Sequence, residues 1–222
     1  MSKIISIPDH ILFEDDYILV INKPHGLMVE PDRNGYPNLL QQVQQYIRKS
    51  IYPNKEVYAQ HIHRLDRPVS GIVLFAKQKS VLKNLSEQFA ERRVKKYYQA
   101  ITENKPPSLI GKLENWTRKE KKKAVILEEA LEYCEKAILE YEVSSLSQNR
   151  HLWNIELHTG KFHQIRAQLA FVNCPIIGDK LYGSVTDYQA DSISLHAYKL
   201  IFAHPITGFE LTIINEKNWT FS

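Results

Sequence analysis

A short apolar run, Ile72 to Ala76, is the feature of this sequence that most constrains its fold. The run follows Gly71 and ends at Lys77. Its short length and the glycine before it favour a buried strand over a helix. The residues just before it, His63-Arg64-Leu65-Asp66-Arg67-Pro68-Val69-Ser70, contain a proline-marked turn. Exposed turns beside rigid strands often carry functional side chains, so we expect a site here.

The remaining hydrophobic patterns predict an α+β fold. In chain order they indicate a β-hairpin, two helices on either side of the buried strand, another strand, a second hairpin and a third helix: residues 11–22, 37–47, 80–92, 97–102, 138–157 and 162–171. The periodicity of residues 127–136 does not decide between helix and strand. No internal repeat or long linker divides the sequence, so we expect a single domain over residues 1–222.

Composition narrows the class of protein. A chain of 222 residues with 43% hydrophobic residues can bury a full core. It has neither a membrane-spanning apolar run nor a signal-peptide pattern at its first residues, so we expect no membrane association. Cys134 and Cys174 are too few and too far apart for a zinc ligand set or a disulfide framework. Two lone cysteines fit a reducing, cytoplasmic location.

Positive charge is concentrated between Lys77 and Lys123, which we call the basic segment. It holds 14 Lys and Arg against 5 Asp and Glu, whereas the whole chain has a net charge of +4. Within it, residues 92–98 (Arg-Arg-Val-Lys-Lys-Tyr-Tyr) interleave cations with aromatic rings. Cations meet phosphates and rings stack on bases, so the segment predicts contact with single-stranded or looped RNA. For residues 118–123 alone we favour a solvated helix end or a flexible lysine loop.

Asp66 is the main candidate for chemistry, because Arg64 and Arg67 flank it. Cations near a carboxylate favour its ionised form, and charge-assisted hydrogen bonds orient it, as an activated nucleophile requires. An ordinary surface ion pair has the same pattern and is the commoner case. His61 and His63 would share one face of a strand, but no third ligand follows at a suitable spacing, so we expect no metal site. The sequence also lacks phosphate-binding, dinucleotide-binding and serine-hydrolase motifs.

Several motifs, taken in order, resemble the RluA-type RNA pseudouridine synthases. The catalytic motif of that family is His-Arg-Leu-Asp, two variable residues, then Thr-Ser-Gly; this chain has HRLDRPVSG at residues 63–71, with Val69 in place of threonine. Residues 22–26 (NKPHG) resemble the Asn-Lys-Pro-x-Gly turn of the family. Lys96 and Tyr98 align with its Lys-x-Tyr motif, and residues 157–166 (LHTGKFHQIR) with its Leu-x-Thr-Gly-Arg-x-His-Gln-Ile-Arg block.

The resemblance covers residues 11 to 211 approximately and has two further departures. Lys161 replaces the usual arginine, and Gln168 stands where a histidine is common. Members often carry an N-terminal S4-type RNA-binding domain, which we do not expect here. Arg67-Pro68 after the aspartate resembles the branch that modifies a tRNA uridine near the acceptor stem.

The resemblance implies a fold and an activity. The expected fold is a mixed, mostly antiparallel sheet with flanking helices and a central RNA-binding cleft. The expected activity is isomerisation of uridine to pseudouridine in tRNA or rRNA. Because reactant and product are isomers, no redox or group-transfer cofactor is expected. The target base must be flipped out of its stack to be reached. Nothing in the sequence requires more than a monomer.

The resemblance also implies roles for individual residues. Asp66 is expected to be the nucleophile, with Arg166 as its ion-pair partner. Tyr98 should stack on the target base and Arg64 should fill the space that the flipped nucleotide leaves. Arg67, Lys96, His63 and Gln164 complete the expected substrate-binding set.

Each of these roles has a structural alternative. Asp66 and Arg166 could form a buried structural pair, Arg64 could bind only phosphate, and Tyr98 could be a core aromatic. Two other functions also remain open. One is a non-catalytic RNA-binding domain of the same fold. The other is a glycoside or nucleoside hydrolase, which needs two facing carboxylates; Asp179 is the only plausible second one.

Overall fold

The computed structural model describes residues 3–31, 35–50, 57–146 and 149–220. The chain divides into two compact units. Unit 1 comprises Met1–Val94 and Tyr198–Lys217, and unit 2 comprises Lys95–Ala197 and Asn218–Ser222. No helix in the described ranges is long and apolar enough to cross a membrane.

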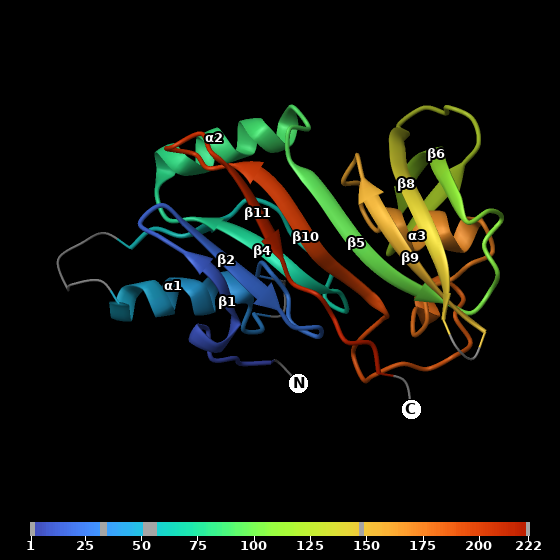
Figure 1. Ribbon diagram of the computed structural model, residues 1–222, viewed down its shortest axis with the longest axis horizontal. Coiled ribbons are helices and arrows are strands. Elements are labelled where there is room, and N and C mark those ends of the chain that lie inside the picture. The colour runs from blue at the N-terminus through green and yellow to red at the C-terminus, as the bar shows by residue number, and fades with distance from the viewer. Residues whose placement is uncertain (1–2, 32–34, 51–56, 147–148, 221–222) are drawn as a thin grey trace. The chain divides into compact units, whose positions relative to one another are not determined.

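Unit 1 is a sheet with the strand order β1-β2-β4-β10, flanked by α1 and α2 (Figure 1). Its elements are η1 (Pro8–His10), β1 (Ile11–Glu14), β2 (Ile18–Lys23), α1 (Leu39–Ser50), β3 (Gln60–His61), β4 (Ser70–Ala76), α2 (Lys79–Ala90), most of β10 (Leu195–Ala203) and β11 (Glu210–Ile214). The short strand β3 pairs with β4, and β11 pairs with β10. The pairings β1–β2, β2–β4, β3–β4 and β10–β11 are antiparallel.

The buried strand predicted from residues 72–76 is confirmed as β4, whose seven residues are all buried. One face of the sheet packs against α2 in a single core cluster: Ile18, Val20, Ile72, Leu74, Ala76, Val81, Leu85, Val94, Leu200, Phe202 and Ile213. Alternate residues of β2 and β4, such as Leu19 and Phe75, are also fully buried. Both faces of β4 are therefore covered, which explains why its sequence is apolar without alternation.

Unit 2 is a second sheet segment, with the order β5-β9-β8-β6-β7. Its elements are β5 (Lys95–Thr102), β6 (Ile110–Glu120), β7 (Lys123–Leu127), β8 (Glu135–Leu146), β9 (Arg150–Leu157), α3 (Gln164–Phe171) and η2 (Lys180–Tyr182). The pairings β5–β9, β8–β9, β6–β8 and β6–β7 are antiparallel. Trp153 of β9 is fully buried, and its Nε1–H donates to Thr102 Oγ1 at 2.9 Å. The indole anchors β9 to β5.

The structure corrects two local predictions and completes a third. Residues 118–123 are not a helix end or a flexible loop: Glu120 pairs with Lys123 across the tip of the β6–β7 hairpin. The third helix begins at Gln164 rather than at residue 162, because His163 has a left-handed φ of 51°. Residues 127–136, which the periodicity left open, end β7 and begin β8 with turns between them.

Candidate active site

Asp66 lies in the turn that leads into β4, in unit 1. Its carbonyl oxygen accepts the N–H of Val69 at 3.0 Å, which closes the turn over Arg67 and Pro68. The Asp66 side chain is partly buried and Arg67 is exposed, whereas Val69 and the following residues are buried. The carboxylate is therefore carried by a turn anchored on the buried strand.

Hydrogen bonds join this turn to the loop that follows β2. The Gly26 N–H donates to the Arg67 carbonyl at 2.8 Å, and Arg67 Nε donates to the Gly26 carbonyl at 3.2 Å. Lys23 Nζ donates to the carbonyls of Leu27 (2.8 Å), Pro24 (3.0 Å) and Arg67 (3.4 Å). The two motifs, NKPHG and HRLD, thus form one bonded structure.

Lys23 is fully buried between these two bonded loops. Burial lowers its pKa to about 7, while the charge of Asp66 raises it and the charge of Lys3 lowers it. From the sequence, Lys23 was expected to shape the turn and cleft and to take no part in the chemistry. Its position two residues after the apolar residues of β2 was the available signal for burial.

Arg64 is exposed beside the turn and contacts a partly buried polar group. An Nη1 proton of Arg64 is donated to Glu30 Oε1, and His61 Nε2 lies 3.5 Å from Glu30 Oε2. Burial lowers the pKa of His61, and the charge of Glu30 opposes this effect. Glu30 had not been singled out, because it lies 34 residues before Arg64 and outside any motif.

His63 has a supporting position. Its Nε2 accepts the N–H of Leu74 at 3.2 Å, and its ring stacks on Phe89 with centroids 5.1 Å apart. The imidazole therefore joins the turn to β4 and α2.

In the described ranges no group of three or more His, Cys, Asp or Glu side chains could hold a metal ion.

Tyr98 and Lys96 lie on β5, in unit 2. Tyr98 is buried and pairs in register with Ile155 of β9. The two residues are two apart on a strand, so their side chains share a face. A Cβ added to Gly160 would lie 3.6 Å from Lys96 Nζ. The turn formed by Thr159, Gly160 and Lys161, which we call the TGK turn, therefore passes close to the Lys96 ammonium.

Arg166 of α3 is held rigidly within unit 2. Its Nε and Nη2 donate to Asp179 Oδ2 and Oδ1 at 2.7 and 2.9 Å, and both side chains are buried. The guanidinium carbon lies 5.1 Å from the centre of the Tyr182 ring. The Tyr182 hydroxyl in turn accepts the N–H of Ala124 at 2.7 Å and lies 3.0 Å from His163 Nδ1. A two-point ion pair and a ring fix the guanidinium plane.

This geometry shows that Asp179 is the ion-pair partner of Arg166. From the sequence, Asp179 was only a candidate second carboxylate for a hydrolase. Both of its oxygens bind Arg166, and its side chain is buried. We therefore treat Asp179 as the residue that orients Arg166, which removes the support for the hydrolase alternative.

Gln164 is the buried centre of another network in unit 2. Its Oε1 accepts Thr159 Oγ1–H at 2.7 Å and the Lys161 N–H at 3.0 Å. Its Nε2 donates to the Ile138 carbonyl at 3.2 Å and to Gln168 Oε1 at 3.0 Å. The amide therefore ties the TGK turn to α3 and β8. Contact between Gln164 and a substrate stays a prediction.

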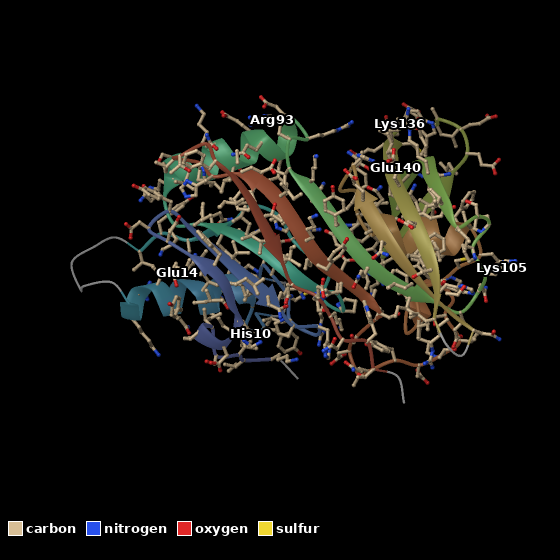
Figure 2. The ribbon with its side chains drawn as sticks, viewed as in Figure 1. His10, Glu14, Arg93, Lys105, Lys136 and Glu140 are labelled. Atoms are coloured by element: carbon tan, nitrogen blue, oxygen red, sulfur yellow. The ribbon has the colours of Figure 1, made fainter. Side chains whose placement is uncertain are left out.

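Part of the basic segment is neutralised by carboxylates. The pairs are Lys77–Glu14, Arg93–Glu91, Lys112–Glu114 and Arg118–Glu120. Glu114 also binds Lys136, which lies on β8 with Glu140 (Figure 2), and these two lysines lower the pKa of Glu114 to about 2. Lys119 lies over the Phe162 ring, 4.6 Å from its centre. Glu91, Glu114 and Glu120 are already among the 5 acidic residues counted in the segment, so only Glu14 adds a neutralising charge from outside it.

Comparison with known proteins gives consistent matches. A family model described as RNA pseudouridylate synthase matches residues 17–171. Ribosomal large subunit pseudouridine synthase D of Borreliella burgdorferi is 30% identical over 199 residues, which cover 88% of this chain and 61% of that protein. tRNA pseudouridine synthase C of Pasteurella multocida is 33% identical, over 91% of this chain and 89% of that protein.

Among solved structures, human RNA Pseudouridylate Synthase Domain Containing 4 matches with a TM-score of 0.77 and 24% identity. The match covers 95% of this chain and 89% of that one, and it shows the likeness of fold. The chain thus spans about three fifths of the length of the Borreliella relative but nine tenths of the Pasteurella relative.

Proposed function

Since this chain belongs to the RluA type of the RNA pseudouridylate synthase family, we propose that it isomerises uridine in RNA to pseudouridine. The reaction breaks the glycosidic C–N bond, turns the free base and rejoins it to the sugar through carbon. Atoms and electrons balance within the nucleotide itself. The chemistry required of the protein is therefore nucleophilic attack, proton movement and orientation of the base.

The observation that carries this proposal is the placement of Asp66. Its turn follows the HRLD motif, lies within the matched residues 17–171 and is bonded to the NKPHG loop through Gly26 and Lys23. A nucleophile needs a fixed direction, and a turn anchored on a buried strand supplies one. We propose Asp66 as the nucleophile, attacking either the sugar or the base.

The other roles follow from the family motifs and from side-chain chemistry. Arg166 is proposed to pair with Asp66 when RNA excludes water, and Tyr98 to stack on the uracil ring. Arg64 is proposed to enter the space left by the flipped nucleotide. Its exposure supports this role, because the ion pair with Glu30 lies near the surface and costs little to open. Arg67, Lys96, His63 and Gln164 are proposed to shape or contact the bound nucleotide.

The substrate is proposed to be tRNA or rRNA, with the grip supplied in part by the basic segment. The names of the relatives refer to the ribosomal large subunit for one and to tRNA for the other. We further propose that residues 1–222 act as a single catalytic domain, as a monomer in the cytoplasm.

The test is turnover on total tRNA and rRNA, with pseudouridine counted by mass spectrometry. The wild type should form pseudouridine, which a non-catalytic RNA-binding domain would not. Asp66→Asn and Asp66→Ala should form none while still binding RNA. The matched control is Asp9→Asn, which changes an exposed aspartate of unit 1 and should leave turnover intact. Turnover in either Asp66 variant would refute the nucleophile assignment.

A further inference from the structure

The ring of Phe162, in unit 2, lies between an imidazole and an ammonium group. It is stacked on His163, with the ring centroids 3.8 Å apart and the planes 18° from parallel. Lys119 Nζ lies over the same ring, 4.6 Å from its centre. Because the imidazole covers one face so closely, the ammonium covers the other. Phe162 occupies a variable position of the family motif, so the resemblance gives its ring no role.

The β6–β7 hairpin sets the direction of the Lys119 side chain. Lys119 pairs with Ala124 across the hairpin, and paired residues project to the same face of a sheet. Ala124 packs in a core cluster beside Phe162, so this face of the hairpin lies toward the Phe162 ring. The neighbours Arg118 and Glu120 project to the other face and pair with each other. Lys119 is therefore the cation that the hairpin directs to this ring.

The cover that Lys119 gives to the Phe162 ring is easily displaced. The lysine is exposed, and an exposed cation–ring contact is weaker than the stacking of a nucleobase on an aromatic ring. A base can therefore replace the ammonium on this face with a net gain in affinity. The displaced ammonium then contacts a phosphate of the same strand. The tip of the hairpin adds further exposed positive charge from Lys121, Lys122 and Lys123.

A series of ring contacts connects Phe162 to Arg166. The His163 ring, on which Phe162 stacks, meets the Tyr182 ring edge-on with centroids 5.7 Å apart. The Tyr182 ring in turn lies 5.1 Å from the guanidinium carbon of Arg166. Phe162 thus belongs to the same rigid group as the arginine proposed to pair with Asp66. A base stacked on Phe162 would belong to a nucleotide near the target uridine.

We propose that Phe162 and Lys119 form a binding site for an unpaired nucleotide of the RNA that lies near the target uridine and is not itself modified. The Phe162 ring stacks on the base of this nucleotide, and the Lys119 ammonium contacts a phosphate beside it. This inference rests on the proposed function in taking RNA as the substrate. It adds a contact that only an unpaired base can make, so it selects looped RNA over duplex RNA.

Binding to RNA without uridine tests this site apart from the chemistry. The probe is an adenosine–cytidine strand of about 12 nucleotides, and the second probe is a guanosine–cytidine duplex of equal length. Phe162→Leu keeps an apolar side chain beside Ala124 and removes the ring. It should weaken binding of the single strand by about 5-fold to 50-fold and leave binding of the duplex unchanged. Phe162→Tyr, which keeps a ring, should bind both probes as the wild type does.

The salt dependence of binding separates the lysine from the ring. Loss of one phosphate contact to a single strand should reduce the slope of log affinity against log salt concentration by about 0.7. Lys119→Met should show this reduction, whereas Phe162→Leu should keep the slope of the wild type. Lys112→Met is the matched control, because it removes a lysine of the same strand that pairs with Glu114. Its slope should equal that of the wild type.

Wild-type affinity in Phe162→Leu would overturn the proposal, and so would an equal loss for the strand and the duplex or an unchanged slope in Lys119→Met. If Phe162→Leu does not fold, NMR of the wild type decides: the ring resonances of Phe162 should move upfield when the adenosine–cytidine strand is added, and unmoved resonances would contradict the stacking.

Pseudouridine counts on tRNA and rRNA keep this proposal separate from the proposed function. Turnover by the wild type with undiminished single-strand binding in Phe162→Leu would refute the nucleotide site alone. The expected losses of affinity and slope in a protein that forms no pseudouridine would refute the proposed function alone.

Discussion

The two arginine–carboxylate pairs of the site segments differ in almost every physical respect. In unit 1, Arg64 and Glu30 are 56% and 35% exposed. In unit 2, Arg166 and Asp179 are 6% and 1% exposed and are joined by two hydrogen bonds. An exposed pair contributes little and can exchange partners, whereas a buried pair cannot be opened without stranding a charge. Unit 1 therefore carries the adaptable arginine and unit 2 the fixed one.

Breaking the buried pair should have the largest effect. Asp179→Asn leaves the Arg166 charge without its carboxylate, so we expect a loss of about 3–5 kcal/mol in the free energy of unfolding. Pseudouridine formation should fall with it, because the guanidinium loses its orientation. Urea unfolding provides the measurement. Asp187→Asn is the control: Asp187 pairs with Lys180 at the surface of the same unit and should change stability by under about 0.5 kcal/mol.

Replacing both members of the buried pair sharpens the result. In the double variant Arg166→Met with Asp179→Leu no charge is left stranded, so most of the stability lost in Asp179→Asn should return. Turnover should not return, because the proposed partner of Asp66 is gone. Recovery of turnover together with stability would show that Arg166 is only structural.

The network around Gln164 should come next in size. Gln164→Leu leaves the Thr159 hydroxyl and the Gln168 amide with one partner fewer in a buried site. We expect unfolding to become easier by about 1–3 kcal/mol. RNA affinity, measured well below the unfolding temperature, should stay near that of the wild type if the amide acts within the protein. A large loss of affinity in a stable Gln164→Leu would instead favour direct contact with RNA.

Breaking the exposed pair should give the smallest change in stability. RNA binding should become tighter rather than weaker. Glu30→Gln frees Arg64 from a carboxylate that competes with phosphate. Stability should change by less than about 1 kcal/mol, and RNA should bind about threefold more tightly at fixed salt. Glu210→Gln, an exposed change of equal charge on β11, is the control for net charge. Equal gains in both variants would mean that Glu30 does not restrain Arg64.

The elements with a strong apolar pattern could be predicted, and those built by charged residues could not. β4 was predicted because both of its faces are buried. The β6–β7 hairpin was missed because its turn lies within the charged run of residues 118–123, where Lys121 takes a positive φ of 51°. The start of α3 was misplaced because Phe162 continues the apolar spacing of the helix, whereas the left-handed φ of 51° at His163 delays the helix until Gln164.

The candidate site likewise contains residues that sequence motifs indicate and partners that they do not. Its motifs singled out Asp66, Tyr98 and Arg166 because their order along the chain is distinctive, and the roles of these residues stay predictions. The partners of these motifs depend on tertiary structure. Asp179 lies 13 residues from Arg166, and Glu30 lies 34 residues from Arg64. No local spacing rule connects such residues, so they could be found only in the folded chain.

The burial of Lys23 also makes one contribution to stability depend on pH. Its pKa is about 7 in the folded protein against 10.5 for an unperturbed lysine. Between these values the unfolded chain binds a proton that the folded chain does not, so this residue makes folding more favourable as pH rises. The contribution of Lys23 to the free energy of unfolding should therefore be smallest below about pH 7 and largest above pH 10.5.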